Sequence, residues 1–84
     1  MGAKQNSMAY EPIFTNKAMA VMRSQNISRE EVLTAFHSNN LESVRIPGAV
    51  QGIATLRSSI VGCIYKKNQR GQYVVITCWK RDRA

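Results

Sequence analysis

The sequence is poor in the residues that build metal and cofactor sites. Its 84 residues include one histidine, two cysteines and five acidic side chains. The cysteines lack the Cys-x-x-Cys spacing of metal and redox motifs. The only adjacent acids, Glu30 and Glu31, would point in different directions from a helix. No glycine-rich phosphate-binding loop is present. The sequence therefore predicts neither a metal site nor a bound cofactor.

Long hydrophobic runs are absent as well. No segment has the roughly 20 apolar residues that a membrane-spanning helix needs. Residues 1–7 also lack the apolar core of a signal peptide. We therefore expect a cytoplasmic protein with no membrane partner. Residues 1–9 are expected to form a flexible tail, and residues 10–84 a single small domain without room for a large catalytic cleft.

Acidic residues are scarce in the second half of the chain, and this gives the protein its net charge of +7. Residues 1–44 contain four Lys or Arg and four acids, which cancel. Residues 45–84 contain eight Lys or Arg and one acid, which accounts for the whole excess. Such asymmetry favours a polyanionic partner, either RNA or another nucleic acid, or an acidic protein. A membrane surface fits less well, because no basic amphipathic helix is evident.

Two short helices are predicted in the neutral first half. Thr15 is a suitable N-cap for a helix from residue 16 to about residue 24. Ser28 and Glu31 have the spacing of a capping box, in which each side chain bonds the other residue's amide. Apolar residues at helical spacing follow this box as far as Phe36. We expect these helices to cover a sheet.

Four strands are predicted after the helices, over residues 41–46, 50–57, 59–66 and 73–80. The last two are rich in Val, Ile, Tyr, Thr and Trp, and a polar segment containing Gly71 separates them, as in a β-hairpin. The order predicts fold class α+β, with two N-terminal helices packed on a curved, mostly antiparallel sheet of about four strands.

Because side chains alternate along a strand, the terminal hairpin has two predicted faces. The first set is apolar and is expected to face the core: Ile60, Gly62, Ile64, Val74, Ile76 and Cys78. The second set mixes aromatics and cations and is expected to be free: Val61, Cys63, Tyr65, Lys67, Tyr73, Val75, Thr77, Trp79 and Arg81. This alternation places Cys63 and Cys78 on opposite faces, where they cannot form a disulfide.

Candidate functional residues come mostly from the basic half. Metal-free cleavage of RNA needs groups that activate the 2′-hydroxyl, protonate the leaving oxygen and neutralise the phosphorane. The candidate catalytic residues are Lys17, His37, Arg57 and Tyr65. Nucleic-acid binding needs cations for phosphates and aromatic rings for unpaired bases. The candidate binding residues are Arg45, Lys66, Lys67, Arg70, Tyr73, Trp79, Lys80 and Arg81.

These candidates also have purely structural explanations. His37 can interact with a helix C-terminus, and Lys17 can be a solvated helix residue. Arg57 and Tyr65 can be ordinary strand residues. The cations between the last two strands can simply keep a loop soluble, and Trp79 can pack against a helix or a second subunit. The sequence leaves these alternatives open.

Three segments give the chain a resemblance to a known group of proteins. They are residues 14–22, residues 26–32 with the capping box, and the Val- and Thr-containing strand at residues 74–79. Together with two short helices before a basic sheet, they resemble the RelE/BrnT-like toxin superfamily, and more narrowly a small bacterial family of uncharacterised domains near it. The resemblance covers about residues 13–79. Lys17 stands where that family has a histidine, Val21 where it has an arginine, and Asn26 where it has a glycine.

The resemblance implies a toxin-like protein that acts on RNA, either a metal-independent endoribonuclease or an inactive descendant, held by an acidic antitoxin. Two alternatives are a non-catalytic nucleic-acid-binding module and a protein-interaction domain, also as a homodimer, with an acidic partner. Toxicity on expression would distinguish the first hypothesis from the others. A steep fall of RNA affinity with salt would separate the second from the third.

Overall fold

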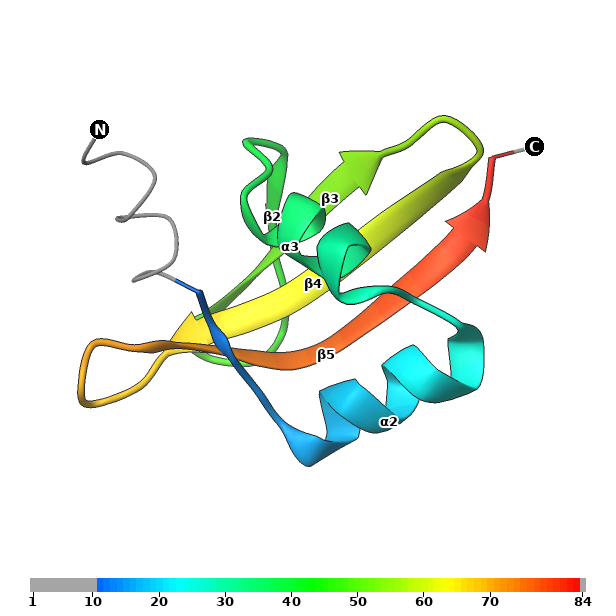
Figure 1. Cartoon of the computed structure of the whole chain (residues 1–84). Helices are drawn as coiled ribbons and strands as arrows, with labels where there is room; N and C mark the ends of the chain where they lie inside the picture. The colour runs from blue at the N-terminus through cyan, green and yellow to red at the C-terminus, as the bar shows by residue number, and fades with distance from the viewer. Residues whose placement is uncertain (1–10, 84) are drawn as a thin grey trace, which may run out of the picture.

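The chain folds into two helices on one face of a five-stranded sheet (Figure 1). The computed structural model describes residues 11–83. The elements are β1 (Ile13–Phe14), α2 (Asn16–Gln25), α3 (Arg29–Phe36), β2 (Leu41–Ser43), β3 (Ala49–Thr55), β4 (Ser59–Lys67) and β5 (Tyr73–Asp82). The predicted α+β class is confirmed. The predicted tail at residues 1–9 lies outside the described residues.

The strands are arranged in the order β1-β5-β4-β3-β2. Strands β2 to β5 pair antiparallel with their neighbours in sequence, whereas β1 pairs parallel with β5 at the edge of the sheet. The sequence prediction lacked β1, because a strand of two residues carries no alternation. Strand β2 is shorter than predicted and ends before the turn at Pro47 and Gly48, where Gly48 has a φ of 79°.

Both helices begin at the predicted caps. The Thr15 hydroxyl accepts a hydrogen bond from the Ala18 amide at 3.0 Å. The capping box is complete: the Ser28 hydroxyl accepts from the Glu31 amide at 3.0 Å, and the Glu31 carboxylate accepts from the Ser28 amide at 2.9 Å. These bonds satisfy amides that the first turn of a helix leaves without partners.

The core lies between the sheet and the two helices. Helix α2 packs along β5, and α3 packs over β4 and β3 (Figure 1). Helix α3 can approach β3 closely because Gly52 has no side chain. A Cβ at this position would collide with the carbonyl oxygen of Ala35. The buried cluster consists of Ala18, Ile27, Val32, Ala35, Phe36, Ala54, Val61, Cys63, Tyr65, Val75 and Cys78.

The predicted faces of β4 are reversed in the structure. Val61 and Cys63 are fully buried under the helices and Tyr65 is 8% exposed, although all three were expected on the free face. Ile60 and Ile64 alternate with them and therefore face away from the helices. Both sets of β4 side chains are largely apolar, so the alternation alone does not tell which set the helices cover.

A β-bulge divides the prediction for β5, whose faces are reversed before the bulge and as predicted after it. Ile64 pairs with Thr77 and Tyr65 pairs with Val75, so Ile76 is an extra residue in β5. Beyond a bulge the side-chain alternation shifts by one. The helix side of β5 therefore carries Tyr73, Val75, Cys78, Lys80 and Asp82, and the opposite side carries Val74, Thr77, Trp79 and Arg81.

The two cysteines illustrate the effect of the bulge. Cys63 and Cys78 are direct cross-strand neighbours on the helix side, so the prediction of opposite faces is wrong. Both are buried free thiols. Removal from water disfavours a thiolate, so burial raises the pKa of Cys63 to about 12 and also raises the pKa of Cys78.

Candidate nucleic-acid interface

The face of the sheet turned away from α2 and α3 is not covered by any described element. We call it the open face. The apolar side chains of this face include Ile53, Ile60 and Ile64, and all three are half-buried. By strand register it carries Glu42, Ala49, Gln51, Ile53, Thr55, Ile60, Gly62, Ile64, Lys66, Val74, Thr77, Trp79 and Arg81.

Trp79 is the central side chain of the open face. It is paired with Gly62 on β4, and a Cβ at that position would collide with the indole ring. The ring therefore lies flat against the backbone of β4. Its Nε1 atom donates a hydrogen bond of 2.7 Å to Oε1 of Gln51 on β3, which fixes the ring across the strand. The guanidinium of Arg81 lies over the ring, 5.5 Å from its centroid.

The polar chain continues from Gln51 to the sheet edge. The Nε2 atom of Gln51 donates to Oε1 of Glu42 on β2 at 3.3 Å. Glu42 and Gln51 are direct cross-strand partners, so both side chains project from the open face. A single row of contacts thus runs from β5 across β4 and β3 to β2.

Two cations of the open face belong to the predicted binding set. Arg81 is exposed beside Trp79, and Lys66 is exposed at the other end of β4. Among the described residues, the ion pairs are those of Arg29 with Glu11 and of Lys80 with Glu31. Neither involves Arg81 or Lys66, so both charges are available to an anionic ligand.

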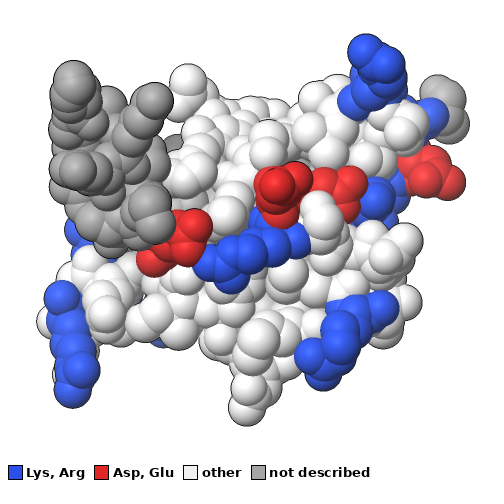
Figure 2. All heavy atoms as spheres, viewed as in Figure 1, with Lys and Arg blue, Asp and Glu red and all other residues white. Residues whose placement is uncertain are grey.

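The helix side carries a different balance of charge. Figure 2 shows the acidic side chains of this side close to cationic ones over the helices. Lys80, a predicted binding residue, is neutralised there by Glu31 at 3.0 Å. Lys67 lies 5.1 Å from the ring centroid of Tyr73, so these two predicted residues are together but on the face opposite Trp79.

The remaining predicted binding residues lie in turns. Arg45 is exposed between β2 and β3, and Arg70 is exposed in the turn between β4 and β5. That turn is shaped by Asn68, whose side-chain oxygen accepts from the amides of Arg70 and Gln72 at 2.9 Å each. Gly71 follows with a φ of 81°, a conformation that suits glycine.

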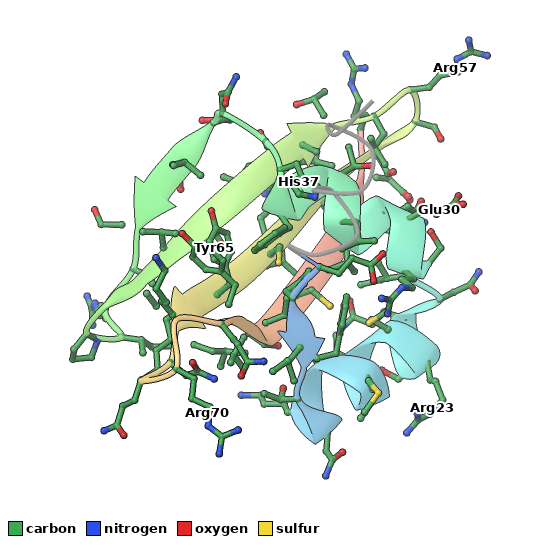
Figure 3. All side chains as sticks on the ribbon, turned by 60° about the vertical axis from the view of Figure 1, so that its left-hand side comes forward. Arg23, Glu30, His37, Arg57, Tyr65 and Arg70 are labelled. Atoms are coloured by element: carbon green, nitrogen blue, oxygen red, sulfur yellow. The ribbon has the colours of Figure 1, made fainter. Side chains whose placement is uncertain are left out.

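The four candidate catalytic residues do not form one site. Lys17 is exposed on α2, and Arg57 is exposed in the turn between β3 and β4. Figure 3 shows Arg57 at the tip of that turn, far from Tyr65. Six residues of β4, 59–64, lie between that turn and Tyr65, which corresponds to about 20 Å in a strand. Any cleavage chemistry would have to use a subset of them.

His37 and Tyr65 both line an open pocket of about 330 Å³, together with Phe36 and Tyr73. The ring of Phe36 contacts Tyr65 edge-on, with centroids 4.6 Å apart. Burial raises the pKa of the Tyr65 phenol, with the nearby Cys63 and Tyr73 as smaller causes. The phenol therefore stays protonated at neutral pH and can only donate a proton.

Sequence reasoning missed three residues of the open face. Gly62 was expected only as part of the apolar set that faces the core, and neither Gln51 nor Glu42 was a candidate. The one available signal was a glycine inside a β-branched strand, which indicates a close approach by another group. The identity of that group, Trp79, depends on the register of β4 and β5.

The comparisons with known proteins add no assignment. No family model matches the chain, and no curated protein or solved structure shows significant similarity to it. Within residues 11–83, no helix is long and apolar enough to cross a membrane. The same residues contain no group of three or more His, Cys, Asp or Glu side chains that could hold a metal ion.

Proposed function

We propose that the protein binds single-stranded RNA across its open face. The observation that carries this proposal is the Trp79 ring, held flat over Gly62 by its bond to Gln51. It lies on a sheet face that no element of residues 11–83 covers, near cations that are outside the ion pairs of those residues. The indole is already fixed, so a base that stacks on it would take the place of the Arg81 guanidinium over the ring and free that cation for a phosphate. Proteins that bind single strands combine such platforms with cations that contact the phosphates.

Expected energies favour Trp79 as the anchor. Stacking of one base on an aromatic side chain contributes about 1–3 kcal/mol. The half-buried isoleucines around the ring add apolar surface on which neighbouring bases can rest. Arg81 and Lys66 would contact phosphates, and each such contact releases counterions, so affinity is expected to fall steeply as salt rises.

RNA cleavage by a toxin-like protein, held by an acidic antitoxin, is a second candidate function. The observation that favours it is the pocket that His37 and Tyr65 both line. An imidazole can accept a proton from a 2′-hydroxyl, and the protonated phenol can donate one to a leaving oxygen. The pocket is on the helix side of the sheet, whereas Trp79 is on the open face. RNA that is cleaved in the pocket would therefore have to bind along a different surface from RNA that stacks on Trp79.

The test of the first proposal is the affinity for a labelled, mixed-sequence single-stranded RNA, measured by fluorescence anisotropy. Trp79→Leu keeps an apolar side chain over Gly62 but removes the aromatic surface. We expect it to weaken binding by about 5- to 150-fold, the equivalent of one lost stack. Arg81→Gln should weaken binding at low salt and reduce the slope of log affinity against log salt by about 0.7.

Arg23→Gln is the matched control, because it removes the same charge from an exposed position on α2. It should leave both the affinity and the salt slope nearly unchanged. Equal losses in Arg23→Gln and Arg81→Gln would show that binding depends on net charge alone and would contradict the proposed site.

Gel analysis of the same RNA, with and without EDTA, tests cleavage, and a loss of cleavage in Tyr65→Phe would support the second candidate.

A further inference from the structure

Glu42 is the one acidic side chain that the structure places on the open face. Glu30 and Glu31 belong to α3, Glu11 is paired with Arg29 of α3, and Asp82 is opposite the buried Ser59 on the helix side. A carboxylate beside a bound polyanion lowers affinity through repulsion. A specific interaction with the ligand would offset that cost, and a carboxylate supplies acceptors to a base edge.

The contacts of Glu42 connect it directly to the platform. Trp79 donates to Gln51 at 2.7 Å, and Gln51 donates to Glu42 at 3.3 Å. The indole lies over β4, so Glu42 on β2 is two strands away, or roughly 10 Å at normal strand spacing. A base stacked on the indole would reach part of the way from β4 toward β2, and the exposed side chain of Glu42 can reach the edge of the base from the other direction.

We infer that Glu42 makes the open face selective for guanine, an inference that rests on the proposed binding of single-stranded RNA. The Watson–Crick edge of guanine presents two adjacent donors, its ring N1–H and its exocyclic amino group. One carboxylate can accept from both at once, in a paired geometry with charge-assisted bonds. Adenine and cytosine present one amino group beside a ring acceptor that repels a carboxylate, and uracil presents a single N–H between two carbonyl oxygens.

Gln51 acts as a positioning residue in this arrangement. Its amide oxygen is occupied by the indole and its amino group by Oε1 of Glu42. The bond to Gln51 therefore orients the carboxylate toward the platform while leaving Oε2 and the remaining lone pairs of Oε1 for the base. The site thus has a stacking surface, a cation beside it and a fixed acceptor at its edge.

The test compares short, labelled all-uridine RNAs that differ only in one central base: guanine, inosine, adenine, cytosine or uracil. Affinity is measured by anisotropy at one salt concentration. A bidentate contact typically discriminates by about 5- to 150-fold, so guanine should bind at least about fivefold more tightly than adenine. Inosine retains N1–H but lacks the amino group, and it should fall between the two.

Glu42→Gln is the decisive variant. It removes two effects of the carboxylate that act in opposite directions, its bonds to guanine and its repulsion of the RNA phosphates. The variant should bind the guanine strand more weakly and the all-uridine strand more tightly, since the repulsive charge is removed. Glu30→Gln is the control: it removes the same charge from the exposed first turn of α3 and should keep the guanine preference.

The outcomes distinguish failure of the inference from failure of the proposed function. Equal binding of all five RNAs, or an equal gain for all of them in Glu42→Gln, would overturn guanine selection while RNA binding stands. An absence of binding to every strand would overturn both. A preference for guanine that persists in Glu42→Gln would assign the selectivity to another residue and reject the role of Glu42.

Discussion

At the scale of single residues, the open face depends on a missing side chain. Trp79 can lie flat on β4 only because residue 62 is glycine. Gly52 has a parallel role on the opposite face, where it lets the carbonyl of Ala35 approach β3. Two glycines in neighbouring strands thus permit two close approaches, one that builds the core and one that builds the proposed platform.

Replacement of Gly62 by alanine tests this dependence. The new Cβ would occupy the space of the indole, so Trp79 must leave its position and lose its bond to Gln51. We expect Gly62→Ala to lower the free energy of unfolding by about 1–3 kcal/mol, as overpacking does. RNA affinity should fall toward that of Trp79→Leu. Unchanged affinity in a folded Gly62→Ala variant, confirmed by circular dichroism, would argue that the flat ring is not the binding platform.

At the scale of elements, the start of α3 is joined to β5 by one carboxylate. Glu31 accepts from the Ser28 amide and receives both contacts of the Lys80 ammonium, at 3.0 and 3.2 Å. The hydrogen bond from Ser28 is the largest cause that lowers the pKa of Glu31 below its ordinary value of 4.5, and Lys80 is the next. The charged form of Glu31 is therefore the one that stabilises the fold.

This linkage predicts a pH-dependent effect of Glu31→Ala. A carboxyl group whose pKa is lowered by folding stabilises the protein above its unfolded pKa, and this stabilisation is lost as pH falls through the folded pKa. We expect the variant to lower the free energy of unfolding by about 1–2 kcal/mol at neutral pH. The difference from wild type should shrink below pH 4.5.

Urea unfolding at several pH values measures the effect, and Glu30→Ala is the neighbouring control. Glu30 has no part in the capping box or in the described ion pairs, so its loss should cost less. An equal cost for the two variants at neutral pH, or a constant cost for Glu31→Ala down to acid pH, would contradict the assigned role of Glu31.

The caps of α2 and α3 could be predicted from sequence because their partners are three residues apart. The bulge in β5 could not, because the Ile76 carbonyl accepts from the Thr15 hydroxyl, 61 residues away in sequence. That distant bond is made at the bulge, where the side-chain alternation of β5 shifts by one residue. As a result, Tyr73 lies on the helix side of the sheet and Trp79 on the open face. Local chemistry thus predicted the elements, while the faces of the hairpin depended on contacts that only the fold brings together.

The same distinction applies to the candidate site. Trp79, Arg81 and Lys66 were predicted from residue type, because aromatics and cations are typical of surfaces that bind nucleic acids. Strand alternation also placed Trp79 and Arg81 on the free face. Glu42 and Gln51 were not, since an acid and an amide in an edge strand have no such signature. Their role follows from register, which brings β2, β3 and β5 into one row.

At the scale of the whole molecule, the two faces differ in charge and in cover. Four of the five acids belong to the helix side: Glu11 and Glu31 pair with cations, Glu30 lies at the start of α3, and Asp82 lies at the end of β5. The open face has one acid, no covering element among residues 11–83, and cations outside the described ion pairs. A polyanion approaching the molecule would therefore meet less repulsion on the open face.

The most direct measurement of the central claim is the fluorescence of Trp79, the only tryptophan in the chain, during titration with single-stranded RNA. Stacking of a base on the indole should quench its emission, and the quenching should saturate at the RNA concentration that saturates anisotropy. Added salt should shift both curves together. RNA binding that is visible by anisotropy but leaves Trp79 emission unchanged would contradict the account, because the RNA would then be bound elsewhere.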